Sequence, residues 1–179
     1  MIVAGFDGSR DLKYVGAVFG AEGRLRRLLA VLEARYGSAH LRDLPNAATR
    51  ARAAATVLSS GMPLYCLHID LDWVIYEVRS VFPRIPKKGV LKAVARALWP
   101  YVEHLLSEHE VDLVYVCRDV EWVFRDRVSY VVGGLSVLAD SVAWYNLRRP
   151  RGITASGVRE VRLRERLREA AIATLRERR

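Results

Sequence analysis

The sequence predicts an α/β fold in which a mixed β-sheet carries helices on both faces and a charged C-terminal helix follows. Two apolar runs at the start, separated by a short polar turn, are typical of an antiparallel hairpin. Later apolar runs alternate with segments of helical periodicity, as expected of parallel strands joined by helices. Hydrophobic residues make up 51% of the 179 residues, enough for one sizeable core.

The hairpin is expected to have strands over residues 2–7 and 14–19, with a turn over residues 8–11. Asp and Gly favour such turns for conformational reasons alone. A carboxylate at the end of a buried strand is also well placed to hold a metal ion at the edge of a sheet. Asp7 therefore has two interpretations, as a turn residue or as a metal ligand.

Helical periodicity predicts a helix over residues 22–36 that Gly37 ends, and an alanine-rich helix over 47–60. A short strand is expected between them, at 38–41. Strict alternation of apolar and polar residues predicts a strand over 64–71. The alternation would place His68, Asp70 and Asp72 on one face, either as metal ligands or, as we prefer, as the wet side of an edge strand.

A basic loop is expected over residues 83–88 and a helix over 89–109, which Pro100 should kink or divide because proline lacks the backbone N–H. Strands over 111–117 and 129–132 and a helix over 135–147 follow.

The composition changes near Pro150, so we expect a domain over residues 1–150 with residues 151–179 appended as a loop and one Arg/Glu-rich helix over 158–179. The narrow apolar stripe of that helix either docks on the core or pairs with a second copy, which predicts a homodimer. The stripe consists of Leu163, Leu167, Ala171 and Leu175.

The charge of the chain favours polyanionic partners, either nucleic acid or anionic surfaces. Lys and Arg number 29 against 20 Asp and Glu, giving a formal net charge of +9. The chain has no Gln and only two Asn, Asn46 and Asn146, a composition typical of a thermophile that offers a second explanation for the many arginines.

Neither a run of about 18 uncharged apolar residues nor a secretory signal is present, so we expect a cytoplasmic protein that does not enter membranes. Cys66 and Cys117 lie far apart in apolar runs, as buried free thiols or as a disulfide of the kind found in hyperthermophiles.

Three acids are candidates for catalytic chemistry: Asp7 after the first strand, Asp119 after a late strand, and Asp140 in the helix that follows. If they converge, their mutual repulsion requires Mg²⁺ or Mn²⁺ to neutralise it. Two such ions activate water and stabilise the leaving oxygen of a phosphodiester.

The order of these motifs resembles the ribonuclease H-like superfamily. More narrowly, the chain is similar to an uncharacterised family within it, whose members begin with Asp-Glu-Ser-Gly on the first strand and end with an Ala-Asp-hydrophobic-x-Ala helix. The matching segments are Phe6-Asp7-Gly8-Ser9 and Leu138-Ala139-Asp140-Ser141-Val142-Ala143-Trp144, followed by Arg148-Arg149.

The resemblance implies a ribonuclease H-like sheet and a metal-dependent phosphodiesterase or nuclease acting on DNA or RNA. Asp7, Asp119 and Asp140 would be its ligands, with His40 as a fourth. Two departures stand out: Gly8 replaces the family's Glu, and the segment around Ala39 offers His40 but no acid. The alternative is a non-catalytic nucleic-acid-binding or assembly module on the same fold.

Arginines close to these acids are candidates for binding phosphate. Arg148, Arg149 and Arg151 follow Asp140, and Arg10 lies in the hairpin turn. A solvated basic loop without a ligand is the alternative interpretation.

Overall fold

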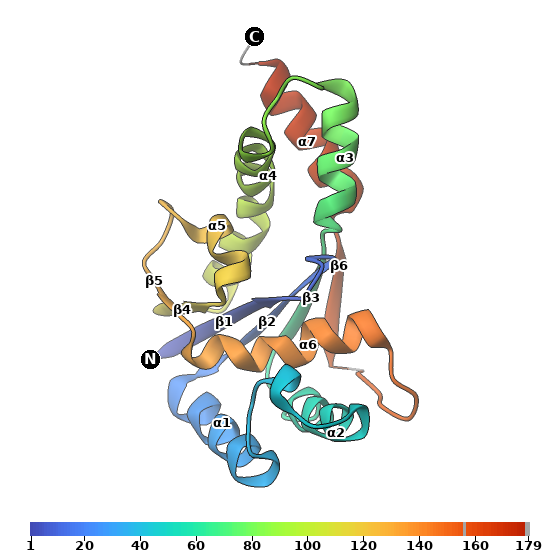
Figure 1. Ribbon diagram of the computed structural model, residues 1–179. Coiled ribbons are helices and arrows are strands. Elements are labelled where there is room, and N and C mark those ends of the chain that lie inside the picture. Colours follow the sequence, from blue (N-terminus) through green and yellow to red (C-terminus); the bar gives the residue numbers. More distant parts are fainter. Residues whose placement is uncertain (156, 178–179) are drawn as a thin grey trace.

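The computed structural model describes residues 1–155 and 157–177, and a six-stranded mixed sheet lies at its centre (Figure 1). The strand order is β5-β4-β1-β2-β3-β6. The sheet confirms the α/β fold with an N-terminal antiparallel hairpin and later parallel strands. The strands are β1 (Ile2–Gly8), β2 (Tyr14–Ala21), β3 (Leu64–His68), β4 (Leu113–Val116), β5 (Tyr130–Val132) and β6 (Val158–Arg162).

The hairpin turn is held by its own polar groups. The Ser9 hydroxyl donates to Asp11 Oδ1 at 2.8 Å and accepts the Tyr14 N–H at 3.0 Å. The Ser9 N–H donates to the Tyr14 carbonyl at 2.8 Å. These contacts fix the register in which Asp7 of β1 lies opposite Gly16 of β2.

Helices cover both faces of the sheet, and each face has its own apolar core (Figure 1). One face carries α1 (Glu22–Tyr36), α2 (Ala47–Leu58) and α6 (Val137–Arg148). The other face carries α3 (Leu71–Val81), α4 (Lys87–Glu108), the short α5 (Glu121–Phe124) and α7 (Arg164–Arg176). Three 3-10 turns complete the described elements: η1 (Leu41–Asp43), η2 (Arg118–Val120) and η3 (Gly134–Ser136).

Helix α6 crosses the middle of the sheet at a very short distance. It packs on β1 and β2 where Gly5 and Gly16 lie. A Cβ atom on Gly5 would lie 2.7 Å from the Leu135 carbonyl oxygen, and one on Gly16 would collide with the Ala139 carbonyl oxygen. The absence of side chains at these two positions lets the backbone of α6 approach the sheet.

The C-terminal segment corrects one prediction. The single helix expected over 158–179 is instead a strand, β6, followed by α7. β6 pairs in parallel with β3, and the Leu163 N–H donates to the His68 carbonyl at 3.0 Å. The apolar stripe of α7 is buried against α3 and α4 of the same chain, so this stripe is not free for a second copy.

Two further expectations were wrong. Residues 38–41 form no strand, because the Ser38 hydroxyl binds the His40 N–H and Asp140 binds the Leu41 N–H. The strand that begins at Leu64 ends at His68, and α3 follows where no helix was expected. Helix α4 continues through Pro100, so of the two predicted effects of this proline the division of the helix is not realised.

None of the described helices has both the length and the apolar composition needed to cross a membrane.

Candidate functional site

A cleft of about 380 Å³ at the C-terminal end of β1 brings six of the predicted site residues together. They are Asp7, Asp119, Asp140, His40, Arg10 and Arg148. The other residues that line it are Gly8, Ser9, Leu41, Arg42, Arg50, Cys117, Trp144 and Leu147. We call it the acidic cleft.

Asp7 lies at the floor of the acidic cleft and is only 3% exposed. Its Oδ1 accepts the Gly8 N–H at 2.8 Å, and the Cys117 thiol is a second hydrogen-bond partner. Burial, and to a smaller extent the nearby charge of Asp140, raise the pKa of Asp7 to about 7 against the lowering effect of the two hydrogen bonds. The fold therefore disfavours the ionised form of this carboxyl.

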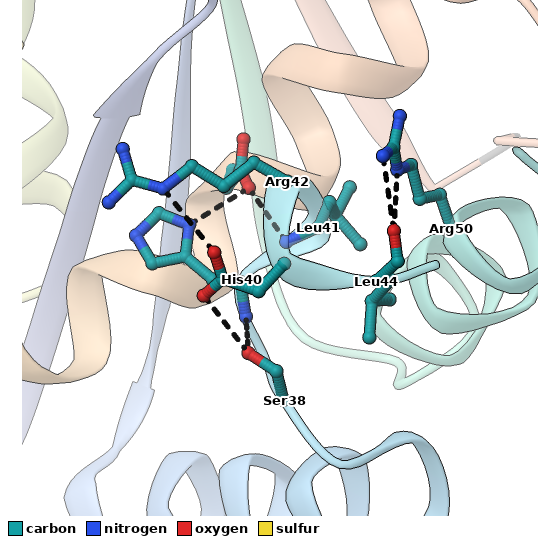
Figure 2. Close-up of polar contacts among 8 residues, drawn as sticks. Ser38, His40, Leu41, Arg42, Leu44 and Arg50 are labelled. Carbon is teal, nitrogen blue, oxygen red and sulfur yellow. Dashed lines mark hydrogen bonds and ion pairs between the residues drawn. The ribbon is translucent and has the colours of Figure 1, made fainter. Parts of the chain in front are cut away.

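Asp140 projects from the first turn of α6 and fixes the segment before η1. Its Oδ2 accepts the Leu41 N–H at 3.2 Å and lies 3.5 Å from His40 Nδ1 (Figure 2). The Asp140 carboxylate raises the pKa of His40 despite the partial burial of the ring. His40 Nδ1 is buried and forms no hydrogen bond within the described part of the chain.

Asp119 lies on the rim of the acidic cleft rather than at its floor. It belongs to η2, directly after β4, and its side chain is exposed. Its main-chain carbonyl accepts the indole N–H of Trp122 at 2.9 Å. Its carboxylate forms no hydrogen bond or ion pair with the residues described, so it is free to turn into the cleft.

Four arginines line the same cleft, and of these only Arg10 and Arg148 were predicted from the sequence. Arg42 comes from η1, and Arg50 comes from α2, where it donates to the Leu44 carbonyl at 3.1 and 3.2 Å (Figure 2). No local pattern marks these two positions, since they reach the cleft only through the packing of α2 and η1 on α6. The cleft therefore combines the buried carboxyl of Asp7 and the partly exposed carboxylate of Asp140 with four arginines.

The other predicted arginines do not line the acidic cleft. Arg149 forms an ion pair with Glu160 at 2.5 Å. Its guanidinium lies 5.9 Å from the centre of the Tyr145 ring. Arg151 lies exposed in the loop after α6.

The three residues predicted to share one face of a strand, His68, Asp70 and Asp72, are not brought together either. His68 ends β3, Asp70 lies 3.5 Å from Arg164, and Asp72 is exposed on α3, so the three do not share a strand face. Cys66 and Cys117 are free thiols, and the disulfide alternative is not realised.

The acidic cleft contains carboxylate side chains of the type that bind a divalent metal ion, but too few such side chains lie close together. Asp7 and Asp140 offer the carboxylate oxygens that Mg²⁺ and Mn²⁺ prefer, whereas the imidazole of His40 is a donor better suited to transition metals. Within residues 1–155 and 157–177, however, no three His, Cys, Asp or Glu side chains gather closely enough to hold an ion.

A wider depression of about 730 Å³ adjoins the acidic cleft and extends it toward β5. The two share His40, Arg42, Cys117 and Asp119. The surface is therefore hollowed on both sides of His40 and Asp119, which leaves room for an extended ligand.

Comparisons with protein-family models, with curated proteins and with solved structures find no match to this chain.

Proposed function

We propose that this protein is a divalent-metal-dependent phosphodiesterase that acts on nucleic acid in the acidic cleft. One observation carries the proposal: the carboxyl groups of Asp7 and Asp140 line one cleft together with four arginines, and the charge of Asp140 disfavours the ionised form of Asp7. Buried acids suit a cation, and arginines around them suit the phosphates of an anionic substrate.

The pair of acids has an electrostatic need that a metal ion would meet. Two neighbouring carboxylates, one of them buried, are not both stable as anions. A proton on Asp7 relieves this in the absence of a cation. Mg²⁺ or Mn²⁺ held by Asp7 and Asp140 would replace that proton, and Asp119 is the third carboxylate on the same cleft. The ion would activate water and neutralise charge on the phosphate.

The arginines would position the substrate. Arg10 and Arg148 are exposed at the cleft and pair with no carboxylate of the described residues, so their guanidinium groups are available for phosphate oxygens. Trp144 lines the cleft beside them and offers a ring on which a base can stack.

A non-catalytic nucleic-acid-binding module is the second candidate, favoured by the incomplete set of metal donors. Position 8 is a glycine, and a Cβ there would collide with the side chain of Leu12. Ala39 is buried.

The experiment compares cleavage of labelled single- and double-stranded DNA and RNA in Mg²⁺, in Mn²⁺ and in chelator. Asp7→Asn and Asp140→Asn should abolish metal-dependent cleavage, whereas the control Asp72→Asn, on the exposed face of α3, should cleave like the wild type. Cleavage that survives in chelator or in Asp7→Asn would overturn the proposal. Binding without cleavage under every condition would favour the module.

Metal binding also has a readout that does not depend on activity. A ligand that binds only the folded state raises the free energy of unfolding, by about 1.4 kcal/mol at tenfold its dissociation constant. Mn²⁺ should therefore raise the melting temperature of the wild type and of Asp72→Asn, but not that of Asp7→Asn. Equal responses in all three proteins would place the ion elsewhere.

A further inference from the structure

A second groove, of about 480 Å³, lies between α4 and the segment around α5, which contact one another (Figure 1). We call it the α4–α5 groove. It is lined by Lys88, Leu91, Lys92, Ala95, Arg96, Trp122, Arg125, Asp126 and Arg127.

The α4–α5 groove is strongly basic. Lys88, Lys92 and Arg96 recur every four residues on α4, so they form one row with steps of about 6 Å along the helix axis. All three are exposed, and none forms an ion pair with a carboxylate in the described ranges. Such a row of unpaired positive charges fits a repeating row of negative charges.

The α5 side of the groove contributes two more basic residues, and nearby acidic residues offset part of its positive charge. Arg125 lies 3.7 Å from Glu121, which offsets part of its charge. Asp126 is the one acid that lines the groove. Arg127 lies with its guanidinium 5.8 Å from the centre of the Trp99 ring and faces no carboxylate within ion-pair distance in the described residues. Five basic residues against one acid leave the lining clearly positive.

Trp122 gives the groove an aromatic surface and connects it to the acidic cleft. Its side chain is half-buried, and its indole N–H donates to the main-chain carbonyl of Asp119 at 2.9 Å. The ring is thereby held in place beside the apolar side chains of Leu91 and Ala95. A fixed aromatic ring among cations is the combination that binds unpaired nucleic-acid bases. Asp119, three residues away, lines the acidic cleft.

We propose that the α4–α5 groove binds a single-stranded nucleic acid and guides it past Asp119 into the acidic cleft. The guiding role rests on the proposed function, whereas binding itself does not. The row on α4 contacts successive phosphates, and Trp122 stacks on a base.

An anionic membrane is the competing partner for a basic surface. A helix that lies on a membrane inserts an apolar face between the lipids. The apolar face of α4, which includes Val90, Val94 and Leu98, is buried in the core and is not available for insertion. The concave shape and the aromatic lining therefore favour a strand of nucleic acid.

The test measures binding of fluorescent single-stranded DNA and RNA of about 15 nucleotides by anisotropy, with Asp7→Asn as the parent so that no cleavage occurs. Adding K92E/R96E should weaken binding at least about tenfold and reduce its salt dependence. The control R27E/R35E changes the net charge equally, at exposed positions on α1, and should weaken binding less than about threefold. Unchanged unfolding curves would show that both variants remain folded.

Binding of other anionic ligands shows whether the groove prefers a single strand of nucleic acid to other polyanions or to a membrane. K92E/R96E should affect the single strand more than a duplex of the same sequence, polyglutamate, or vesicles with anionic lipid. Equal losses for the strand and polyglutamate, or groove-dependent vesicle binding stronger than strand binding, would overturn the proposal. So would equal losses from the groove and control substitutions.

The same variants separate this inference from the proposed function. If K92E/R96E loses strand binding and the wild type cleaves nothing, the groove stands and the phosphodiesterase fails. If the wild type cleaves with metal and K92E/R96E binds and cleaves equally well, the phosphodiesterase stands and the groove proposal fails.

Discussion

At the scale of single residues, Asp7 is held by the fold in an environment that opposes its charge. It is buried, it makes no ion pair with a described cation, and Asp140 lies near it. Only the Gly8 N–H, the Cys117 thiol and the more distant charge of His40 favour the carboxylate. A buried acid kept in such an environment stores free energy that a bound cation would release.

Asp7→Asn is expected to make the protein more stable above neutral pH. The folded state raises the pKa of Asp7 to about 7, so the contribution of this carboxyl to wild-type stability is fully present below about pH 4. It is lost progressively as the pH rises from about 4 through 7. The rise of the pKa from 3.8 to about 7 corresponds to about 4 kcal/mol. This is the upper limit of the increase in the free energy of unfolding that Asp7→Asn should show over the wild type at about pH 8. Urea unfolding of the wild type and of Asp7→Asn between about pH 4 and pH 8 measures this difference in the free energy of unfolding.

The control for this prediction is Asp72→Asn, which removes an exposed acid and should follow the wild-type pH dependence. Parallel curves for Asp7→Asn and the wild type would mean that Asp7 ionises normally in the folded protein. Chelator should be present throughout, so that no trace metal replaces the proton.

At the scale of elements, the placement of Asp140 depends on the contact between α6 and the hairpin. Gly5 and Gly16 allow that contact, because their Cα atoms face the backbone of η3 and α6. Rigid backbone cannot move aside as a flexible side chain can, so even one added methyl group would displace the helix.

Gly16→Ala should therefore destabilise the protein by about 3 kcal/mol, and it should weaken any activity of the acidic cleft by shifting Asp140. Gly23→Ala is the matched control. Gly23 is exposed in α1 with its nearest neighbour, an Arg27 nitrogen, 3.8 Å away, so alanine there should stabilise the helix by about 1 kcal/mol. Chemical unfolding of both variants checks the contrast. Equal effects would exclude a steric role for Gly16.

Sequence patterns predicted those elements whose hydrophobic period matches their structure. The hairpin follows from two apolar runs around a polar turn, and α1 and α6 follow from the helical spacing of their apolar residues. β6 was missed because Val158 and Val161 are its only apolar residues and helical spacing begins just beyond them, at Leu163. The strand predicted over residues 38–41 does not form because the N–H groups of His40 and Leu41 bind side chains, one of them that of Asp140, which is far away in sequence.

The candidate site was predictable only where a residue follows a strand or belongs to a motif. Asp7, Asp119 and Asp140 met that condition, and all three line the acidic cleft. Arg42 and Arg50 did not, because tertiary packing alone brings them there. The groove residues Lys92 and Arg96 form a row that helical spacing contains, but its significance depends on Trp122 across the groove.

At the scale of the whole molecule, α7 completes one side of the core. Leu167, Ala171 and Leu175 are buried between α3 and α4, and the guanidinium of Arg164 lies 4.4 Å from the centre of the Trp73 ring. The charged face of α7 is turned to solvent, which explains why its composition suggested a separate helix.

Leu167→Ala should destabilise the protein by about 3 kcal/mol, since it leaves a cavity at a fully buried position. Arg166→Ala, on the exposed face of α7, should change the free energy of unfolding by less than about 0.5 kcal/mol. Thermal and urea unfolding of both variants measure these changes in the free energy of unfolding. A neutral Leu167→Ala would mean that α7 contributes little to the core.

The position of β6 and α7 has a consequence for biosynthesis. These segments leave the ribosome after every other described element, yet they cover the edge of β3 and the apolar sides of α3 and α4. Until residues 158–176 are made, the nascent chain exposes an open strand edge and uncovered apolar helices, the features that promote aggregation and chaperone capture. A stalled or truncated product would accordingly be more prone to association than the finished chain.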